Sequence, residues 1–423
     1  MTFPGQFFER TGGGRFELRH AGGGYDGLAA LVTPVSSGLD LAVVSTREGF
    51  DALEADWNDL FARAGRSAQL FQAFNWNWHW ANHFIGDGRG RLQLRVVTGR
   101  HHGRLVMVWP LVMERRAGLR VLAWMGEPVS QYGDVLAEDG PAQLEMLREG
   151  WRFVATTLRP DLARLNKTRA DSVVAPLLAE LGAISTQQLE APYLDLASAP
   201  TFEQYAERYP SKARKNRRRL ARRLEEQGAS EFCELAEGPD ASRIAGQAIE
   251  IKRIWLKEKG LVSPALNDAR TMAFFQAAAA DTQRPAKIRV AVLMCGGAVA
   301  AVEIGFACRD RMAIHIMAYD LAFDKAAAGI LLLEHMIETS LASGVAVYDL
   351  MAPGDGYKKE WADGTMRVDD FAVPMTVLGS IFARAYLAFA RPCLKAAVAK
   401  IPLSTRRALS GRLAKAVLIF GGV

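Results

Sequence analysis

The chain has 423 residues, of which 50% are hydrophobic and 23% are charged. This length exceeds what one hydrophobic core usually organises, so two domains are expected, and the composition excludes a largely disordered protein. The four cysteines form no paired motif, and we find neither a secretory signal nor an apolar run long enough for a transmembrane helix, so we expect a cytoplasmic protein.

The net charge of +6 is concentrated in two basic segments. Residues 212–223 carry eight basic side chains and no acidic one, and residues 376–423 carry another eight and no acidic one. Without these two segments, the chain has more acidic than basic side chains. Such concentrated charge indicates partners more strongly than a diffuse excess would.

The organisation along the chain begins with a glycine-rich stretch. Residues 1–38 contain the triple-glycine runs Gly12–Gly14 and Gly22–Gly24, which are costly to order, so a flexible leader is expected. Strand and helix patterns then alternate, which is typical of the α/β class. The predicted domains are residues 39–190, residues 191–375 and a helical tail over 376–423.

Both predicted domains have a similar order of elements, although their sequences are unrelated. In the first, hydrophobic periodicity predicts strands and helices over 41–44, 48–64, 75–84, 92–97, 105–113, 119–124, 143–158, 162–165 and 172–181. In the second, it predicts them over 193–196, a helix capped by Thr201, 211–224, 241–259, 269–281, 287–294, 298–308, 312–319, 329–343, 345–350 and 371–374. A duplicated α/β architecture follows, each half a mixed sheet flanked by helices.

A turn into a helix after Tyr319 and Asp320 is the first candidate site. Small residues open the predicted helix, and a helix N-terminus with small residues suits a phosphate group. We therefore expect the phosphates of a donor to lie against Lys325, Ala327, Ala328, Gly329 and Ile330. The alternative is an ordinary strand-to-helix turn.

The second candidate follows the predicted buried strand that ends at Asp349. A Pro-Gly-Asp-Gly loop leads from it to Tyr357, Lys358 and Trp361. Ligands of open α/β folds favour the carboxyl ends of strands, so we expect Tyr357 and Lys358 in an active cleft, with Asp349 supporting the loop. The alternative is a turn followed by the start of an amphipathic helix.

The basic helix over 212–223 is most simply a solvated face. Eight charges without acidic partners also suit a phosphate-bearing ligand. No aromatic residue interleaves the run, so stacking on bases is not indicated and we expect no specific DNA binding.

Two residues are candidates for the base that takes a proton from an attacking amine or hydroxyl. Glu303 has apolar neighbours in a predicted strand, which favours burial and a raised pKa. His315 on the next strand is its rival. Each is otherwise a satisfied polar residue of the core. His79 and His83 lie four residues apart without the Glu of a zinc-protease motif, so no metal is expected.

Several spaced motifs together resemble the CelD-like acetyltransferases of the GNAT superfamily, named for cellulose and exopolysaccharide biosynthesis. The resemblance covers about residues 40 to 375. Its marks are Phe71-Gln72 and the Trp-rich helix after it, residues 126–134 with Gln131, Tyr132 and Asp134, the basic helix from Ser211-Lys212, Lys252, Trp255, Tyr319-Asp320, Gly329, and Asp349 through Tyr357-Lys358 to Trp361.

The resemblance implies two fused GNAT folds, as in the Fem-type peptidyltransferases, with acetyl-CoA or another acyl-CoA as donor. Within its marks we expect acceptor contacts from Gln131, Tyr132, Asp134, Tyr319, Asp349 and Trp361. The sequence departs from the usual GNAT phosphate loop, because Asp324 and Ala327 stand at two of its fixed positions. Asp324 would repel a pyrophosphate, and Lys325 would compensate.

The expected function is therefore acyl transfer to an amine or hydroxyl of a sugar or amino compound, in exopolysaccharide or cellulose biosynthesis. One alternative is a Fem-like transferase using aminoacyl-tRNA, and another is a non-catalytic adaptor of a polysaccharide synthase. For the tail over 376–423, the alternatives are a peripheral contact with the inner face of a membrane and helices packed on the second domain.

Overall fold

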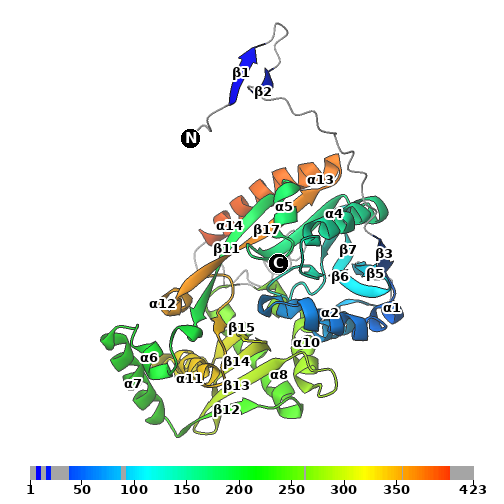
Figure 1. The fold of residues 1–423 in the computed structure, drawn as a ribbon. Helices are drawn as coiled ribbons and strands as arrows, with labels where there is room; N and C mark the ends of the chain where they lie inside the picture. The colour runs from blue at the N-terminus through cyan, green and yellow to red at the C-terminus, as the bar shows by residue number, and fades with distance from the viewer. Residues whose placement is uncertain are drawn as a thin grey trace. The chain divides into compact units, whose positions relative to one another are not determined.

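The computed structural model describes residues 6–10, 16–20, 38–86, 92–261, 263–354 and 356–400. It divides into two compact units, Met1–Ser37 and Gly38–Val423 (Figure 1). In the first, where a flexible leader is expected, β1 (Gln6–Arg10) and β2 (Phe16–His20) pair as an antiparallel hairpin. The two triple-glycine runs lie outside the described residues.

The second unit contains two sheets. The larger has the strand order β12-β13-β14-β15-β16-β11-β17-β10-β8-β7-β4, and the smaller has the order β3-β5-β6-β9. The strands are β3 (Leu39–Val44), β4 (Leu92–Leu94), β5 (Val96–His101), β6 (Arg104–Trp109), β7 (Leu111–Arg116), β8 (Leu119–Trp124), β9 (Leu136–Ala137), β10 (Leu162–Arg169), β11 (Ile184–Asp195), β12 (Ser230–Leu235), β13 (Ile288–Cys295), β14 (Ala298–Cys308), β15 (Arg311–Tyr319), β16 (Val347–Asp349) and β17 (Gly364–Pro374).

Helices connect these strands. They are α1 (Arg47–Asp51), α2 (Glu54–Ala64), α3 (Phe74–Phe84), α4 (Gln143–Phe153), α5 (Ala175–Glu180), α6 (Phe202–Ala206), α7 (Ser211–Glu225), α8 (Pro239–Glu258), α9 (Pro264–Asn267), α10 (Ala269–Ala280), α11 (Ala328–Ala342), α12 (Tyr357–Trp361), α13 (Val377–Ile381) and α14 (Arg391–Ala399). Short 3₁₀ segments are η1 (Ser67–Gln72), η3 (Leu196–Ser198) and η4 (Leu321–Ala326), and π-helical segments are η2 (Val154–Leu158) and η5 (Phe382–Ala390).

The predicted duplication is present as a repeated pair of parallel strands. In the first half, β8 and β10 are parallel neighbours joined through α4, and in the second half β15 and β16 are parallel neighbours joined through α11. Antiparallel strands precede each pair. The mixed α/β class with repeated halves is thus confirmed.

The two halves share strands. β17, the last strand, lies between β10 and β11 and is antiparallel to both, while β11 also pairs with β16. The large sheet therefore runs without interruption from the second half into the first. β11 crosses the expected boundary at residue 190, and that boundary stays a prediction.

A common core also joins the halves. Trp76 on α3 packs edge-on against Phe274 of α10 and Phe306 of β14, with ring centroids 4.6 and 4.4 Å apart. Trp76 is 1% exposed. Burial of such a side chain contributes on the order of 2–3 kcal/mol. The Trp-rich helix is thus an anchor between the halves.

Two predicted strands are each divided in the structure. The segment over 105–113 forms β6 and β7, which belong to different sheets and are separated by Pro110. Proline has no N–H for a ladder, so it suits the point where the chain changes sheets. The segment over 92–97 divides in the same way, into β4 and β5.

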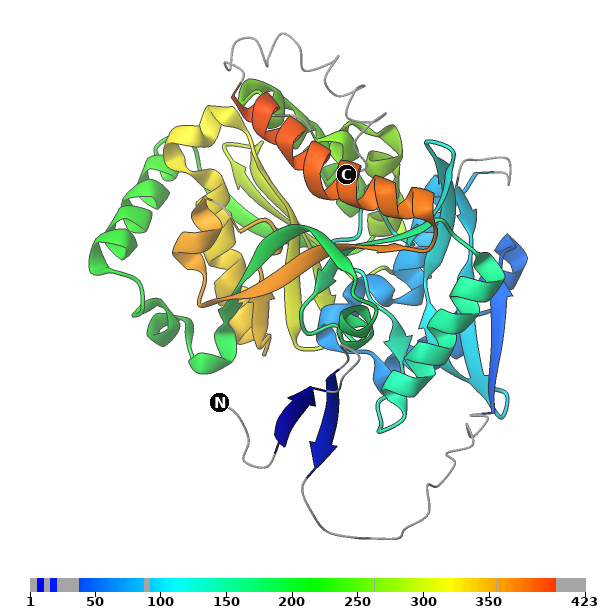
Figure 2. The same cartoon turned by 90° about the horizontal axis from the view of Figure 1, so that it is seen from above.

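The tail begins with one long helix made of α13, η5 and α14. It packs along β11 and β17, as the orange and red ribbon in Figure 2 shows. By length and composition alone, its residues Val377–Ala397 would suffice to cross a membrane, in contrast to the expectation that no such helix exists.

Candidate functional site

The strands β15 and β16 diverge, which opens the large sheet. They pair at three positions, Arg311 with Val347, Met312 with Tyr348 and Ala313 with Asp349. β15 then continues to Tyr319, while β16 ends at Asp349. From Ile314 onward, β15 is therefore not paired with β16. Lys252 of α8 reaches this part of β15 and donates a hydrogen bond to the Met317 carbonyl at 2.9 Å.

The predicted donor loop lies at the far end of β15. Ala327 has the left-handed conformation (φ 53°) and precedes α11, whose first residues, Ala328 and Gly329, are buried. The first amides of a helix have no partners within it, so this end carries partial positive charge. Tyr319 lies over Gly329, since a Cβ added there would be 3.2 Å from its ring. Lys325 is exposed, and Ile330 is half-buried.

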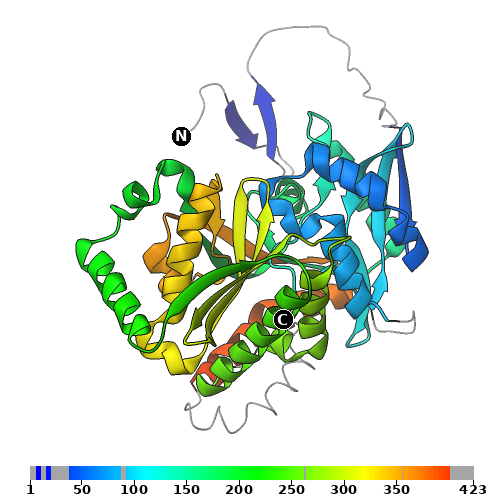
Figure 3. The same cartoon turned by 90° about the horizontal axis from the view of Figure 1, so that it is seen from below.

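The basic helix α7 packs against η4 and α11, next to this loop (Figure 3). One of its cations is structural, because Arg217 is buried, forms an ion pair with Glu334 at 2.6 Å and stacks on the rings of Tyr209 and Trp361. Other cations of the helix point to solvent, namely Lys212, Lys215, Arg218, Arg219 and Arg222. These positive charges lie on α7, which packs against the η4 loop. Asp324 adds a negative charge in that loop.

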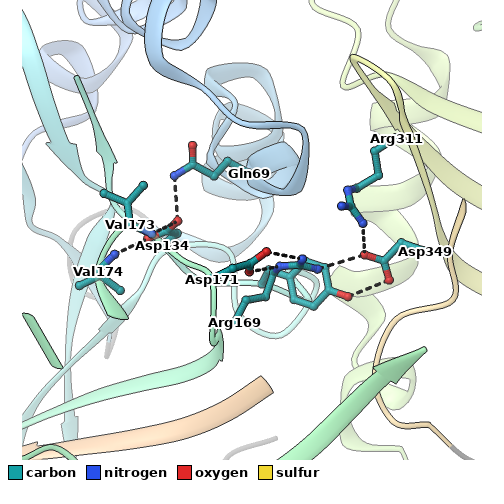
Figure 4. A network of polar contacts seen from close by, with 9 residues as sticks. Gln69, Asp134, Arg169, Asp171, Val173, Val174, Arg311 and Asp349 are labelled. Atoms are coloured by element: carbon teal, nitrogen blue, oxygen red, sulfur yellow. Dashed lines mark hydrogen bonds and ion pairs between the residues drawn. The ribbon is translucent and has the colours of Figure 1, made fainter. Parts of the chain in front are cut away.

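A buried ionic cluster surrounds Asp349 at the end of β16 (Figure 4). Its carboxylate accepts hydrogen bonds from the Tyr132 hydroxyl at 2.9 Å, from Arg311 at 3.0 Å and from Arg169 at 3.3 Å. It also accepts a hydrogen bond from the Met351 amide at 2.9 Å, and this bond holds the loop that follows β16. Asp349 is 1% exposed, so this charge depends on its partners. The sequence predicted that Asp349 supports this loop and contacts substrate, and both roles stay predictions.

Arg169 connects the cluster to Asp171. The two residues form a double hydrogen bond at 2.8 and 2.9 Å, and the guanidinium lies 4.9 Å from the centre of the Tyr132 ring. Burial opposes the charged guanidinium, but the Asp171 hydrogen bond and the charge of Asp349 raise the pKa of Arg169 on balance. Burial and the adjacent Asp349 raise the pKa of Tyr132 well above its ordinary value, so its hydroxyl remains a donor.

Asp134 connects other segments of the first half through hydrogen bonds. Its two oxygens accept from the Gln69 side chain and from the amides of Val135, Val173 and Val174, at 2.8 to 3.0 Å. Burial raises the pKa of Asp134 to about 6, and these donors act against the rise. With its acceptor sites taken, Asp134 has the geometry of a structural link between η1, the loop before β9 and the start of α5.

A cavity of about 250 Å³ lies between these two groups of contacts. It is lined by Arg66, Ser67, Ala68, Gln69, Tyr132, Gly133, Asp134, Arg169, Asp171, Ser172 and Arg311. The Ser172 hydroxyl and the Arg311 Nε are buried there without a hydrogen bond to any described residue. Buried polar atoms without a partner favour a polar occupant of the cavity.

His315 lies on the diverging part of β15. Its Nε2 contacts the Val129 carbonyl oxygen, so that nitrogen must carry the proton and Nδ1 keeps a lone pair. Nδ1 is buried and makes no hydrogen bond to a described residue. Burial lowers the pKa of His315 to about 4, so the ring is neutral at pH 7. Lys167 and Lys358 are near enough to contribute to this shift.

Lys167 enters the same region from a bulge in β10. The register of β10 with β17 shifts between Leu165 and Thr168, and Lys167 itself has φ 54°. Its ammonium donates to the Gln131 side-chain oxygen at 2.9 Å. Bulges commonly redirect side chains next to functional sites. Burial lowers the pKa of Lys167, while the charges of Glu127 and Asp370 oppose that change.

The remaining candidates fall in or near the core of the second half. Glu303 is fully buried, accepts the Tyr348 hydroxyl at 2.7 Å, and burial raises its pKa to about 8. It is therefore mostly protonated at pH 7, which disfavours a base. Trp361 is 4% exposed and packs against Tyr209. Roles for both in chemistry or binding stay predictions.

The predicted Tyr-Lys pair opens α12. Lys358 donates to the Met351 carbonyl at 3.0 Å and so closes the loop after β16, whereas Tyr357 packs against the core of the second half. The structure thus brings Lys358, Asp349, Gln131, Tyr132 and His315 into one region. It places Tyr319 at the other end of β15, where its hydroxyl accepts from Trp255 at 2.8 Å.

The sequence did not single out Lys167, Arg169, Asp171 or Arg311. Three of these lie at or just beyond the carboxyl end of β10, which was predicted to end at residue 165. Had the strand been extended to Arg169, the rule that ligands gather at strand ends would have drawn attention to them. Arg311, at the beginning of β15, carried no such signal.

No metal site emerges from the residues that the structure describes, since no group of three His, Cys, Asp or Glu side chains is placed to hold an ion. Of the two histidines that lie four residues apart, His79 has another partner. His79 contacts the Arg284 carbonyl oxygen through Nε2 at 2.7 Å, and burial lowers the pKa of both His79 and His83.

The second unit has a mixed α/β fold with two repeated halves, in which β15 and β16 pair at only three positions. Residues 211–359, about a third of the chain, match a family model described as acetyltransferase (GNAT) domain. The match lies within the second predicted domain and is shorter than the resemblance over residues 40 to 375. No curated protein sequence matches significantly.

Solved structures resemble the chain at low sequence identity. FemX is 9% identical, with 82% of this chain and 100% of that chain covered and a TM-score of 0.53. L-PGS from Bacillus licheniformis is 13% identical, with coverages of 80% and 97% and a TM-score of 0.47. A tandem GNAT protein from the clavulanic acid biosynthesis pathway is 14% identical, with coverages of 80% and 99% and a TM-score of 0.44. The likeness to FemX concerns the fold alone.

Proposed function

We propose that this chain is an acyltransferase that moves an acyl group from an acyl-CoA thioester to an amine or hydroxyl of a sugar or amino compound. One observation carries the proposal: β15 continues beyond its pairing with β16 to Tyr319, and the N-terminus of α11 follows, within the segment that matches the GNAT domain. An extended donor can add its amides to a free strand edge and place its phosphates at a helix N-terminus.

The residues around α11 fit the phosphates of such a donor. The amides of Ala328 and Gly329 begin the helix, and Lys325 is exposed beside them. Asp324 opposes an anion, but the solvent-facing cations of α7 adjoin the same loop and outnumber it. The departure from the usual phosphate loop is thus offset by charge from a neighbouring helix.

In the proposed reaction, the acceptor attacks the thioester carbonyl carbon. A C–N or C–O bond forms and the C–S bond breaks. The proton that the acceptor loses passes to a base, and the sulfur leaves as a thiolate that takes up this proton to become the free thiol. His315 supports the role of base, because its Nδ1 retains a lone pair and makes no hydrogen bond to a described residue. A low pKa makes it a weak base, so positioning of the reactants would supply most of the acceleration.

The acceptor would enter by the cavity next to Asp349. Paired guanidinium and carboxylate groups line this cavity, and two buried polar atoms in it make no hydrogen bond to a described residue. Hydroxyl-rich or amino compounds satisfy such a mixed set of donors and acceptors. A place in exopolysaccharide or cellulose biosynthesis agrees with this chemistry, and Gln131, Tyr132 and Arg169 are the proposed contacts.

A second candidate uses a donor carried on tRNA, as the Fem-like alternative implies. The five solvent-facing cations of α7 favour it, since they form a surface larger than a pyrophosphate needs. The adaptor alternative is favoured by Asp324 and by the basic tail over 376–423. The two alternatives and the main proposal differ in which ligand binds.

Calorimetric titration of the full chain with acetyl-CoA, and separately with uncharged tRNA, tests the proposal. We expect acetyl-CoA to bind and Lys325→Glu to weaken it roughly tenfold, or about 1.4 kcal/mol. Arg115→Glu, an exposed charge reversal on β7, serves as the matched control and should change nothing. Binding of tRNA without acetyl-CoA would favour the second candidate, and binding of neither would favour the adaptor.

The test uses Lys325 rather than Gly329 for a structural reason. A side chain at Gly329 would press on the Tyr319 ring, so loss of binding in such a variant would mix donor contacts with disturbed packing. Lys325 is exposed and its replacement leaves the packing of α11 intact.

A further inference from the structure

The long C-terminal helix, Val377–Ala399, has one face fixed to the protein. Gly379, Ala383, Leu387 and Arg391 recur every four residues and are buried. The helix approaches so closely at Gly379 that an added Cβ would meet the Asp161 carbonyl oxygen at 1.9 Å. Its first two segments, α13 and η5, pack on β11 and β17. The helix therefore lies along the protein surface and is held there.

The opposite face of this helix is apolar and exposed. Eight large hydrophobic side chains are exposed among the described residues, and five of them lie on this helix: Val377, Leu378, Ile381, Phe389 and Leu394, at 56–76%. Isolated exposed hydrophobic residues are ordinary, but their concentration on one element indicates a binding surface.

The positive charge of residues 376–423 indicates which kind of partner can cover the exposed face of the helix. Residues 376–423 carry eight basic side chains and no acidic one. On the helix, Arg384 is exposed, whereas Lys395 donates a hydrogen bond to Gln187 of β11 at 3.0 Å. A symmetric dimer through this face would bring two such cationic segments together, because the same patch meets itself. Residues 401–423 carry four of the eight cations, so covering the face with them would also gather like charges. An anionic surface meets no such repulsion.

We propose that the exposed face of Val377–Ala399 docks this protein on an anionic lipid bilayer. The helix lies in the plane of the interface, with Ile381 and Phe389 in the acyl region and Arg384 at the phosphate headgroups. A spanning orientation would require the helix to leave β11 and β17, where its other face is buried. This docking is independent of the acyl transfer proposed above.

Flotation of the full chain with vesicles tests the docking. We expect binding to phosphatidylcholine vesicles that contain about a third phosphatidylglycerol, little binding to phosphatidylcholine alone, and loss of binding as salt shortens the roughly 8 Å screening length. The double variant Ile381→Ser, Phe389→Ser should lower the bound fraction at least roughly tenfold. Its matched control is Ile254→Ser, Leu261→Ser, which removes two exposed hydrophobic residues outside this helix and should bind as the unaltered protein does.

A charge variant and a mass measurement complete the design. Circular dichroism would reveal whether the apolar variant is poorly folded. Arg384→Glu, which changes an exposed charge only, should lower binding to anionic vesicles in either case. Equal binding to neutral and anionic vesicles, or equal loss in the control, would overturn the proposal. So would a dimer in sedimentation equilibrium that Ile381→Ser, Phe389→Ser converts to a monomer, because a second copy would then be the occupant of the face.

Discussion

The Tyr132 hydroxyl donates a 2.9 Å hydrogen bond to Asp349, which lies 217 positions further along the chain. Tyr132 belongs to the loop after β8 in the first half, and Asp349 ends β16 in the second. Both side chains are almost fully buried. The ionic cluster is thus a contact between the halves as well as a wall of the cavity.

Removal of the Tyr132 hydroxyl should lower the free energy of unfolding measurably. Tyr132→Phe keeps the ring under Arg169 but leaves Asp349 with one donor fewer, so we expect a loss of about 1–2 kcal/mol in the free energy of unfolding. Urea unfolding followed by tryptophan fluorescence measures it. Tyr193→Phe is the control, since the Tyr193 hydroxyl makes no hydrogen bond to a described residue. Equal losses in both variants would contradict the prediction.

Removal of the central carboxylate should cost more. Asp349→Ala leaves Arg169 and Arg311 buried without their shared counter-charge, and breaking a buried ion pair costs about 3–5 kcal/mol. The comparison is Asp240→Ala, whose side chain is 79% exposed and which should change the unfolding free energy by less than about 0.5 kcal/mol. If Asp349→Ala lowered the free energy of unfolding by less than about 1 kcal/mol, the cluster would be accessible to water and the prediction would be wrong.

Glu303 should give stability a characteristic pH dependence. Burial raises its folded-state pKa from 4.5 to about 8. Between these values the unfolded chain releases the proton and the folded protein keeps it, so stability falls as pH rises, by up to about 1.4 kcal/mol per pH unit. Glu303→Gln does not titrate. The difference in unfolding free energy between the two proteins, measured at pH 5.5, 6.5 and 7.5, should therefore shift steadily in favour of the variant, whereas a constant difference would refute the raised pKa.

The cations of α7 should divide into structural and ligand-facing ones. Arg217→Ala removes the Glu334 ion pair and the stacking on Trp361, with an expected loss of about 2–4 kcal/mol in unfolding free energy. Arg218→Ala, the exposed neighbour, should leave the unfolding free energy unchanged and weaken acetyl-CoA in calorimetry. Similar unfolding curves for the two variants would contradict this division.

Much of the fold could be predicted from the sequence, because periodicity marks amphipathic helices and buried strands. The helix that begins at Ala328 and the strand that ends at Asp349 were predicted within a few residues. β12 and most of β11 were missed. The burial of β11 alternates only loosely along ISTQQLE, so a pattern of apolar residues gave no signal there.

The site was predictable only where a residue lies on a recognisable strand end. Asp349 and Lys358 met that condition. Arg169 also ends a strand, but β10 was predicted to end at residue 165, because the bulge after Leu165 leaves no periodic trace in the sequence. The convergence of Tyr132 with Asp349 required the order of strands in the large sheet, which local patterns do not contain.

The position of β17 determines when the molecule can be completed during its synthesis. Residues 364–374 leave the ribosome after almost all of the chain, yet they fill the gap between β10 and β11. Until then, both of those strands have an unpaired edge open to other nascent chains. A ribosome that stalls before residue 364 would release a product prone to aggregate, and neither half expressed alone would have a finished sheet.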